Sequence, residues 1–148
     1  MRRRLTILFV MMFVTTLAFA QSANLQVSRI MDGKIVPVNR MVVTKVRGRT
    51  LSRYKLNYYR SARFKATTAE ERLCLSAIND DKEKAQSSVA RNARGKSSIA
   101  FMLLPEHGQN RFISYVTQKA GKDKYKVTVI YMEGSVSSLH ELETLINK

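Results

Sequence analysis

Five stretches of the chain carry the alternating or β-branched pattern of strands. Residues 98–104, 111–119 and 124–132 are three closely spaced strand-like stretches separated by turn-forming residues, and residues 124–132 alternate with a period of two. Residues 41–46 are β-branched, and residues 57–66 alternate in the same way. Successive side chains of a strand point to opposite faces, so these stretches predict an antiparallel sheet of about four or five strands.

Helical spacing predicts the other elements. Residues 68–71 read Thr-Ala-Glu-Glu, a sequence typical of a capping box with Thr68 as the cap, and predict a helix to Ile78 that extends over residues 82–93. Leucine and isoleucine recur at helical spacing within residues 136–147 and predict a C-terminal helix. Strands in runs and helices in runs indicate an α+β domain with a central helical segment and a C-terminal helix.

The first twenty residues have the layout of a secretory signal peptide. Three arginines at positions 2–4 precede an apolar run over residues 5–17, and Ala-Phe-Ala at 18–20 places small residues where a signal peptidase cuts. The apolar run is shorter than the roughly 20 residues that span a bilayer, although an uncleaved anchor is the alternative. We expect cleavage before Gln21, export to the periplasm or the medium, no remaining transmembrane anchor, and one domain over residues 21–148.

Charge narrows the choice of partners. The chain has 26 Lys or Arg against 11 Asp or Glu, a net charge of +15, and residues 29–66 hold eleven of the basic residues against Asp32 alone. Outside the cytoplasm the abundant polyanions are lipid headgroups, lipopolysaccharide phosphates and acidic polysaccharides, which a basic surface attracts by long-range electrostatics. We therefore expect an anionic envelope component (lipid or lipopolysaccharide) or another envelope protein as partner, and no nucleic acid.

The stretch 49–66, RTLSRYKLNYYRSARFKA, carries the candidate binding residues. It holds six Lys or Arg, four aromatic residues and no acid. On a strand, Arg63 and Lys65 would face solvent while Ala62 and Phe64 face the core. The candidates for contact with an anionic ligand or a partner are Arg53, Lys55, Tyr59, Arg60, Arg63 and Lys65. The alternative is that the charged row is merely solvated and prevents edge-to-edge aggregation.

Residues that could carry catalysis are few. Cys74 is the only cysteine, so it forms no intramolecular disulfide, and its apolar neighbours predict a buried thiol. His107 lies in a predicted turn and His140 on a polar helix face, so we expect no metal or cofactor. Ser135 lacks the nucleophile-elbow pattern and suits a helix N-cap. The sequence favours a non-enzymatic protein; the alternative is a hydrolase or thiol-dependent enzyme whose site forms only in three dimensions.

Glu133 stands alone as an acid at the end of an apolar strand. It follows Met132 directly and precedes Gly134. We expect it to pair with Arg60 or another arginine; the functional alternative is an acid in a cleft.

Several segments together resemble a known family. They are Leu51 to Leu56, Tyr59 to Ser61, Leu103 to Pro105 ahead of Asn110 to Phe112 and Tyr115, and Ile130 to Gly134 ahead of the terminal helix. In these segments the chain resembles a family of small exported Bacteroidales proteins classed as a domain of unknown function. The resemblance implies an exported single-domain protein and assigns no catalytic or ligand-binding residue.

Overall fold

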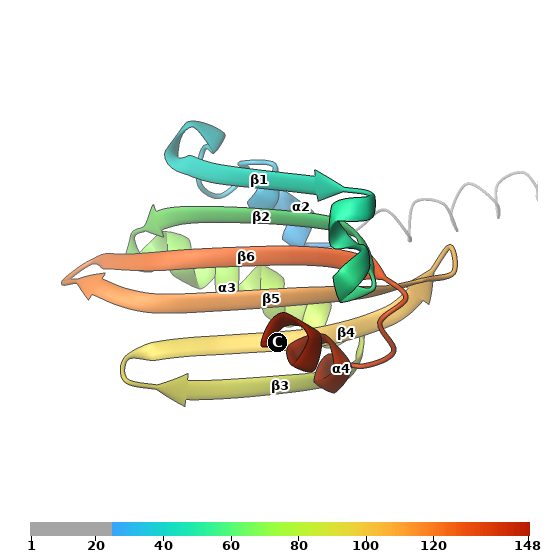
Figure 1. Cartoon of the computed structure of the whole chain (residues 1–148). Coiled ribbons are helices and arrows are strands. Elements are labelled where there is room, and N and C mark those ends of the chain that lie inside the picture. Colours follow the sequence, from blue (N-terminus) through green and yellow to red (C-terminus); the bar gives the residue numbers. More distant parts are fainter. Residues whose placement is uncertain (1–24) are drawn as a thin grey trace, which may run out of the picture.

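The computed structural model describes residues 25–148, and the predicted signal peptide lies outside the described residues. A six-stranded antiparallel sheet with strand order β1-β2-β6-β5-β4-β3 forms the centre of the molecule (Figure 1). The predicted α+β class and antiparallel sheet are confirmed, but four or five strands was too few.

The elements follow the chain in a simple order. The strands are β1 (Met41–Arg47), β2 (Leu56–Ala66), β3 (Ala85–Ala93), β4 (Lys96–Glu106), β5 (Gln109–Gly121) and β6 (Lys124–Gly134). The α-helices are α2 (Val27–Met31), α3 (Thr68–Lys82) and α4 (Leu139–Ile146), and two 3-10 turns are η1 (Val38–Arg40) and η2 (Arg49–Tyr54). The C-terminal helix is thus confirmed.

The missing strand is β3, and the helix predicted over residues 82–93 was wrong there. Residues 87–93 pair with β4, and no side chain of β3 is fully buried. An edge strand exposed on both faces has no alternation of apolar and polar residues, so its composition suggested a helix. Pairing with β4 overrides that weak local preference.

Helix caps also differ from the prediction in position. The cap of α3 is Thr67, not Thr68: its hydroxyl accepts a hydrogen bond from the Glu70 amide at 3.2 Å, and the Glu70 carboxylate accepts from the Thr67 amide at 3.0 Å. Arg40 donates to both carboxylate oxygens of Glu70, at 2.8 and 3.0 Å, and so favours this register. The cap of α4 is Ser138 rather than Ser135.

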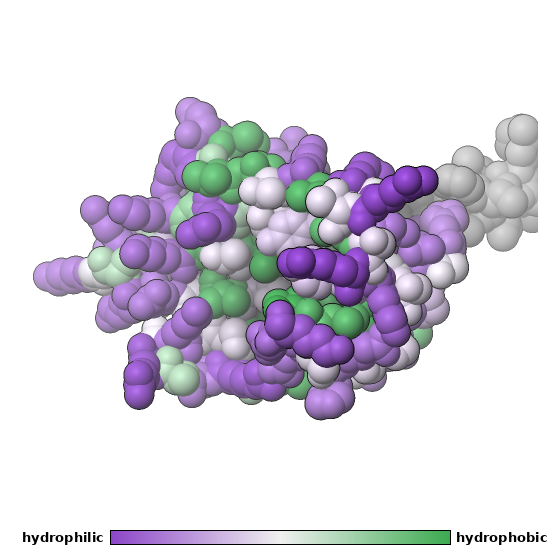
Figure 2. All heavy atoms as spheres, in the orientation of Figure 1, coloured by the Kyte–Doolittle hydropathy of each residue, from purple (hydrophilic) through white to green (hydrophobic). Residues whose placement is uncertain are grey.

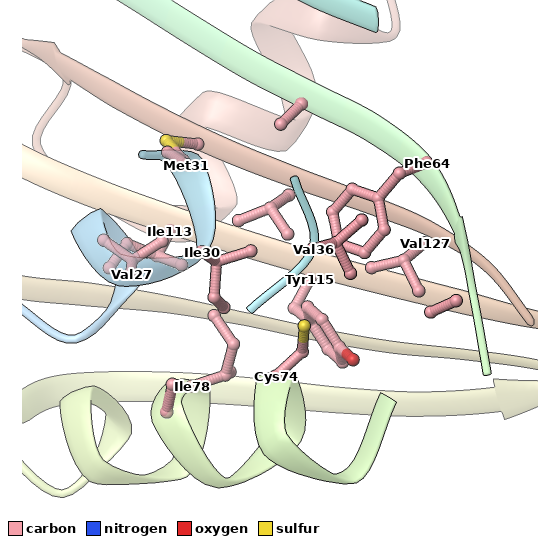
Figure 3. Packing of buried hydrophobic residues seen from close by; sticks show 14 of the residues in the cluster. Val27, Ile30, Met31, Val36, Phe64, Cys74, Ile78, Ile113, Tyr115 and Val127 are labelled. Carbon is pink, nitrogen blue, oxygen red and sulfur yellow. The ribbon is translucent and has the colours of Figure 1, made fainter. Parts of the chain in front are cut away.

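The sheet separates two hydrophobic clusters. One face, the helix face, is covered by α2 and α3, and its cluster includes Phe64, Cys74, Ile78 and Tyr115 (Figure 3). The other face, the open face, is covered only at one end, by η2 and α4 (Figure 1). Its cluster is smaller and includes Leu51, Leu56, Met102, Phe112, Met132, Val136 and Leu142.

A buried acid fixes α2 against α3. Both carboxylate oxygens of Asp81 accept hydrogen bonds from backbone amides, those of Gln26 and Val27, each at 2.8 Å. Asp81 is fully buried, and its burial raises the pKa of its carboxyl above the usual range despite these bonds. These two bonds therefore hold the start of the short helix α2 in place over the sheet.

Candidate anion-binding face

The six predicted residues do not form one site. Arg53 lies in η2 and Lys55 directly after it, whereas Tyr59, Arg63 and Lys65 lie on β2 with side chains toward the open face. Arg60 is on β2 with the opposite parity and points to the helix face. Strand alternation therefore places Arg60 on the face opposite to Tyr59, Arg63 and Lys65.

Three of the six have structural roles in the folded chain. The guanidinium of Arg53 lies over the Tyr54 ring at 4.6 Å from its centroid, and the ammonium of Lys55 pairs with Glu141 at 2.9 Å. Tyr59 is half-buried against the open-face cluster.

The side-chain parity predicted for β2 is confirmed. Ala62 and Phe64 are buried in the helix-face cluster, and Arg63 and Lys65 are exposed on the open face. These two cations therefore remain as candidates for ligand contact.

Neighbouring strands add two cations that the sequence analysis did not identify. Lys126 on β6 lies directly opposite Lys65, and the same row continues through Gln118 on β5 to Lys96 on β4. We call Arg63, Lys65, Lys96 and Lys126 the basic end. Adjacent strands are about 4.8 Å apart, so the row from β2 to β4 spans about 15 Å.

The cations of the basic end form no ion pairs within the described part of the chain. All four cations are exposed, and among residues 25–148 none has an ion-pair partner within 4.0 Å. Glu143 on α4, which lies over the other half of this face, is paired with Arg91 at 2.6 Å. Figure 2 shows hydrophilic side chains gathered around the end of the sheet away from α4.

The pairing of Lys65 with Lys126 is the most informative feature of this surface. Like charges directly opposite on an antiparallel pair destabilise the sheet. An anion between the two ammonium groups would remove that repulsion. The arrangement is therefore chemically suited to bind a phosphate or carboxylate.

Small and apolar side chains lie between and beside these cations. Thr128, Val116 and Ser98 form the adjoining row between Arg63 and Arg91 and are partly buried. Val42, at the β1 end of the same row, is 66 % exposed. The surface therefore combines cations with an exposed apolar side chain.

The residues considered for catalysis are placed far less favourably. Cys74 is buried in the helix-face cluster, as predicted, and burial raises the pKa of its thiol to about 12, so it is not a thiolate at neutral pH. His107 lies in the β4–β5 turn with its side chain 84 % exposed. Across residues 25–148, no group of three His, Cys, Asp or Glu side chains could hold a metal ion. None of the helices in that range has the length and apolar character needed to cross a membrane.

Among residues 25–148 Glu133 has no ion-pair partner within 4.0 Å, although Arg111 lies opposite it in the register, so the expected pairing with Arg60 or another arginine was wrong. Arg60 pairs with Asp32 at 3.3 Å and donates to the Met31 carbonyl at 3.2 Å. Glu133 accepts a hydrogen bond from the Tyr131 hydroxyl at 2.6 Å. Met31, Arg60, Tyr131 and Glu133 line a cavity on the helix face.

Comparison with known proteins gives a family but no activity. Residues 13–146 match the model of a family described as "Family of unknown function (DUF6108)". A crystal structure of human STARD10 is similar at a TM-score of 0.27 and 9% sequence identity, over 80% of this chain and 71% of that one, which is too distant to support an argument. The search of curated proteins found no match.

Proposed function

Because the chain belongs to a family of unknown function, we propose its role from the surface itself: it is a non-enzymatic binding module whose basic end contacts the anionic headgroups of a lipid surface. The observation that carries the proposal is the direct opposition of Lys65 and Lys126, neither of which has an ion-pair partner within 4.0 Å in the described part of the chain. This proposal rests on export, because the leader sequence predicts that the domain meets the cell envelope.

The shape and composition of the basic end favour a lipid surface over an isolated ion. Its four cations are exposed and spread over three strands of one sheet face, so several headgroups could be contacted together. Val42 is exposed on the same face and would meet the region between headgroups. Each Lys or Arg near an anionic membrane contributes about 1 kcal/mol, so four would contribute about 4 kcal/mol, close to a thousandfold in partitioning.

Cosedimentation with vesicles tests this proposal. We would use residues 21–148, since the apolar leader would itself bind lipid, and vesicles of phosphatidylcholine with or without phosphatidylglycerol. Binding should require the anionic lipid and should fall steeply as salt is raised, because exposed charges are screened over about 10 Å at 0.1 M ionic strength.

A charge-matched pair of variants locates the binding surface. Reversing Arg63, Lys65 and Lys126 to Glu should abolish cosedimentation. Reversing three exposed cations elsewhere, Lys34, Arg72 and Lys84, changes the net charge equally and should retain most of it. Equal loss in both variants would mean that net charge alone attracts the protein, and binding unaffected by the first variant would refute the proposal.

A further inference from the structure

A second candidate site lies on the opposite face of the sheet, between α2 and the ends of the central strands. It is a cavity of about 270 Å³ whose lining includes Val27, Met31, Tyr58, Tyr131, Glu133 and Arg111. Pockets that enclose drug-sized ligands have about 300 to 1,000 Å³. This cavity therefore suits a molecule of about one ring.

The walls of the cavity have different characters. Val27 and Met31, from α2, supply an apolar wall. Tyr58 and Tyr131 supply an aromatic wall, with their rings edge to face at 6.0 Å between centroids. The guanidinium of Arg47 lies 4.3 Å from the centroid of the Tyr58 ring and helps to hold it. A ligand with an apolar ring body would pack against these walls.

Existing bonds already occupy most of the charged groups. The Arg111 guanidinium donates two hydrogen bonds to the Leu104 carbonyl, at 3.1 and 2.9 Å, and pairs with Glu106 at 3.0 Å. Arg60 pairs with Asp32. Because both guanidinium groups are already paired, neither is free to pair with a phosphate ligand. The positive charge of the two arginines also disfavours a cationic ligand.

Glu133 and Arg60 retain hydrogen-bonding capacity. One Glu133 oxygen accepts from Tyr131, and the carboxylate has no cation within 4.0 Å among the described residues, so it can accept further bonds. The Nε of Arg60 is a buried donor that lacks an acceptor among the same residues. A hydroxyl is both donor and acceptor, whereas an ammonium only donates and a phosphate dianion only accepts.

From these groups we propose that the cavity binds a neutral, polyhydroxylated ring, the chemical class of a monosaccharide unit. The ring body packs against the tyrosines and the apolar side chains of α2. One hydroxyl donates to the Glu133 carboxylate, and another accepts from Arg60 after a small movement of its side chain. This site is independent of the basic end, because it lies on the other face of the sheet.

Titration of the ¹⁵N-labelled full-length protein, followed by amide chemical shifts, tests the proposal. The probes are the methyl glycosides of glucose, galactose, mannose and N-acetylglucosamine, with cyclohexylamine and inorganic phosphate as charged comparisons. At least one glycoside should give saturable shifts centred on Tyr58, Arg111 and Glu133, and neither charged probe should do so. Absence of saturable shifts with every glycoside, or stronger binding of either charged probe, would overturn the proposal.

Variants then assign the contacts. Tyr58→Leu should weaken glycoside binding about tenfold through loss of the ring contact, whereas Tyr54→Leu, which alters a tyrosine on the other face, should leave it unchanged. Glu133→Gln keeps an acceptor for the Tyr131 hydroxyl and should weaken binding only a few-fold. Undiminished binding in Tyr58→Leu would show that the glycoside binds elsewhere, and the amide spectrum of each variant reports whether it is folded.

Discussion

Replacing Lys126 with Glu should stabilise the fold while it impairs binding to anionic lipid. Lys126 faces Lys65 directly across β6 and β2, so the substitution converts a like-charge pair into an opposite-charge pair. Cross-strand charge pairs contribute roughly 0.2 to 1 kcal/mol in either direction. The reversal should therefore raise the free energy of unfolding by about 1 kcal/mol after allowance for solvent exposure of both groups.

Thermal unfolding followed by circular dichroism gives the measurement. Unfolding entropy is about 2.1 cal/mol/K per residue, so a domain of this length gains about 4 °C in Tm for each kcal/mol. We expect a rise of about 4 °C at low ionic strength and a much smaller one at high salt, because the two side chains are exposed and screened. The same variant should lose much of its vesicle binding.

Lys119→Glu provides the matched control. Lys119 lies on β5 and is also exposed, but its neighbour in the register is Tyr125 rather than a cation. It makes the same change in net charge without removing a cross-strand repulsion. If both variants shift Tm equally, or if the gain from Lys126→Glu persists at high salt, the local repulsion at the basic end is not the cause and the reasoning fails.

Asp81→Asn should lower the free energy of unfolding by about 2 kcal/mol in chemical denaturation, because the side-chain amide cannot accept hydrogen bonds from both backbone donors. The same substitution at the exposed neighbour, Asp80→Asn, should have little effect. Gly134→Ala should lower the free energy of unfolding by about 3 kcal/mol in the same assay, since an added Cβ would lie 2.2 Å from the backbone oxygen of Lys55. A near-neutral result would contradict that packing. In the native protein, Cys74 should react with a thiol reagent no faster than the domain opens, because burial raises the pKa of its thiol to about 12. Immediate stoichiometric labelling would contradict its buried position.

The predictable part of the fold came from elements that are buried on one face. Residues 124–132 alternate because Val127 and Val129 pack into the helix-face cluster while Lys126 and Thr128 lie on the open face, and turn residues mark the ends of β5 and β6. The edge strand β3 escaped detection because neither of its faces is buried, so no period of two is imposed on its sequence, and because it lacks the β-branched residues that marked the equally exposed edge strand β1.

The candidate site could be predicted only in part, for a related reason. Strand parity identified Arg63 and Lys65 as exposed, since that property is local to β2. Lys96 and Lys126 belong to strands remote in the chain, and their alignment with Lys65 depends on the β2–β6–β5–β4 register, which no local pattern encodes. The cavity near Glu133 likewise requires α2 to fold back over the sheet.

The position of β2 in the sheet has a consequence for the order of assembly during synthesis. β1 and β2 are made early, yet the strand that flanks β2 on its other side is the last one of the chain. A two-stranded unit alone is at best marginally stable in water, and pairing over so long a separation is slow. The nascent chain therefore completes its sheet only after β6 has left the ribosome, and until then the β1–β2 pair has no partner on the inner side of the sheet.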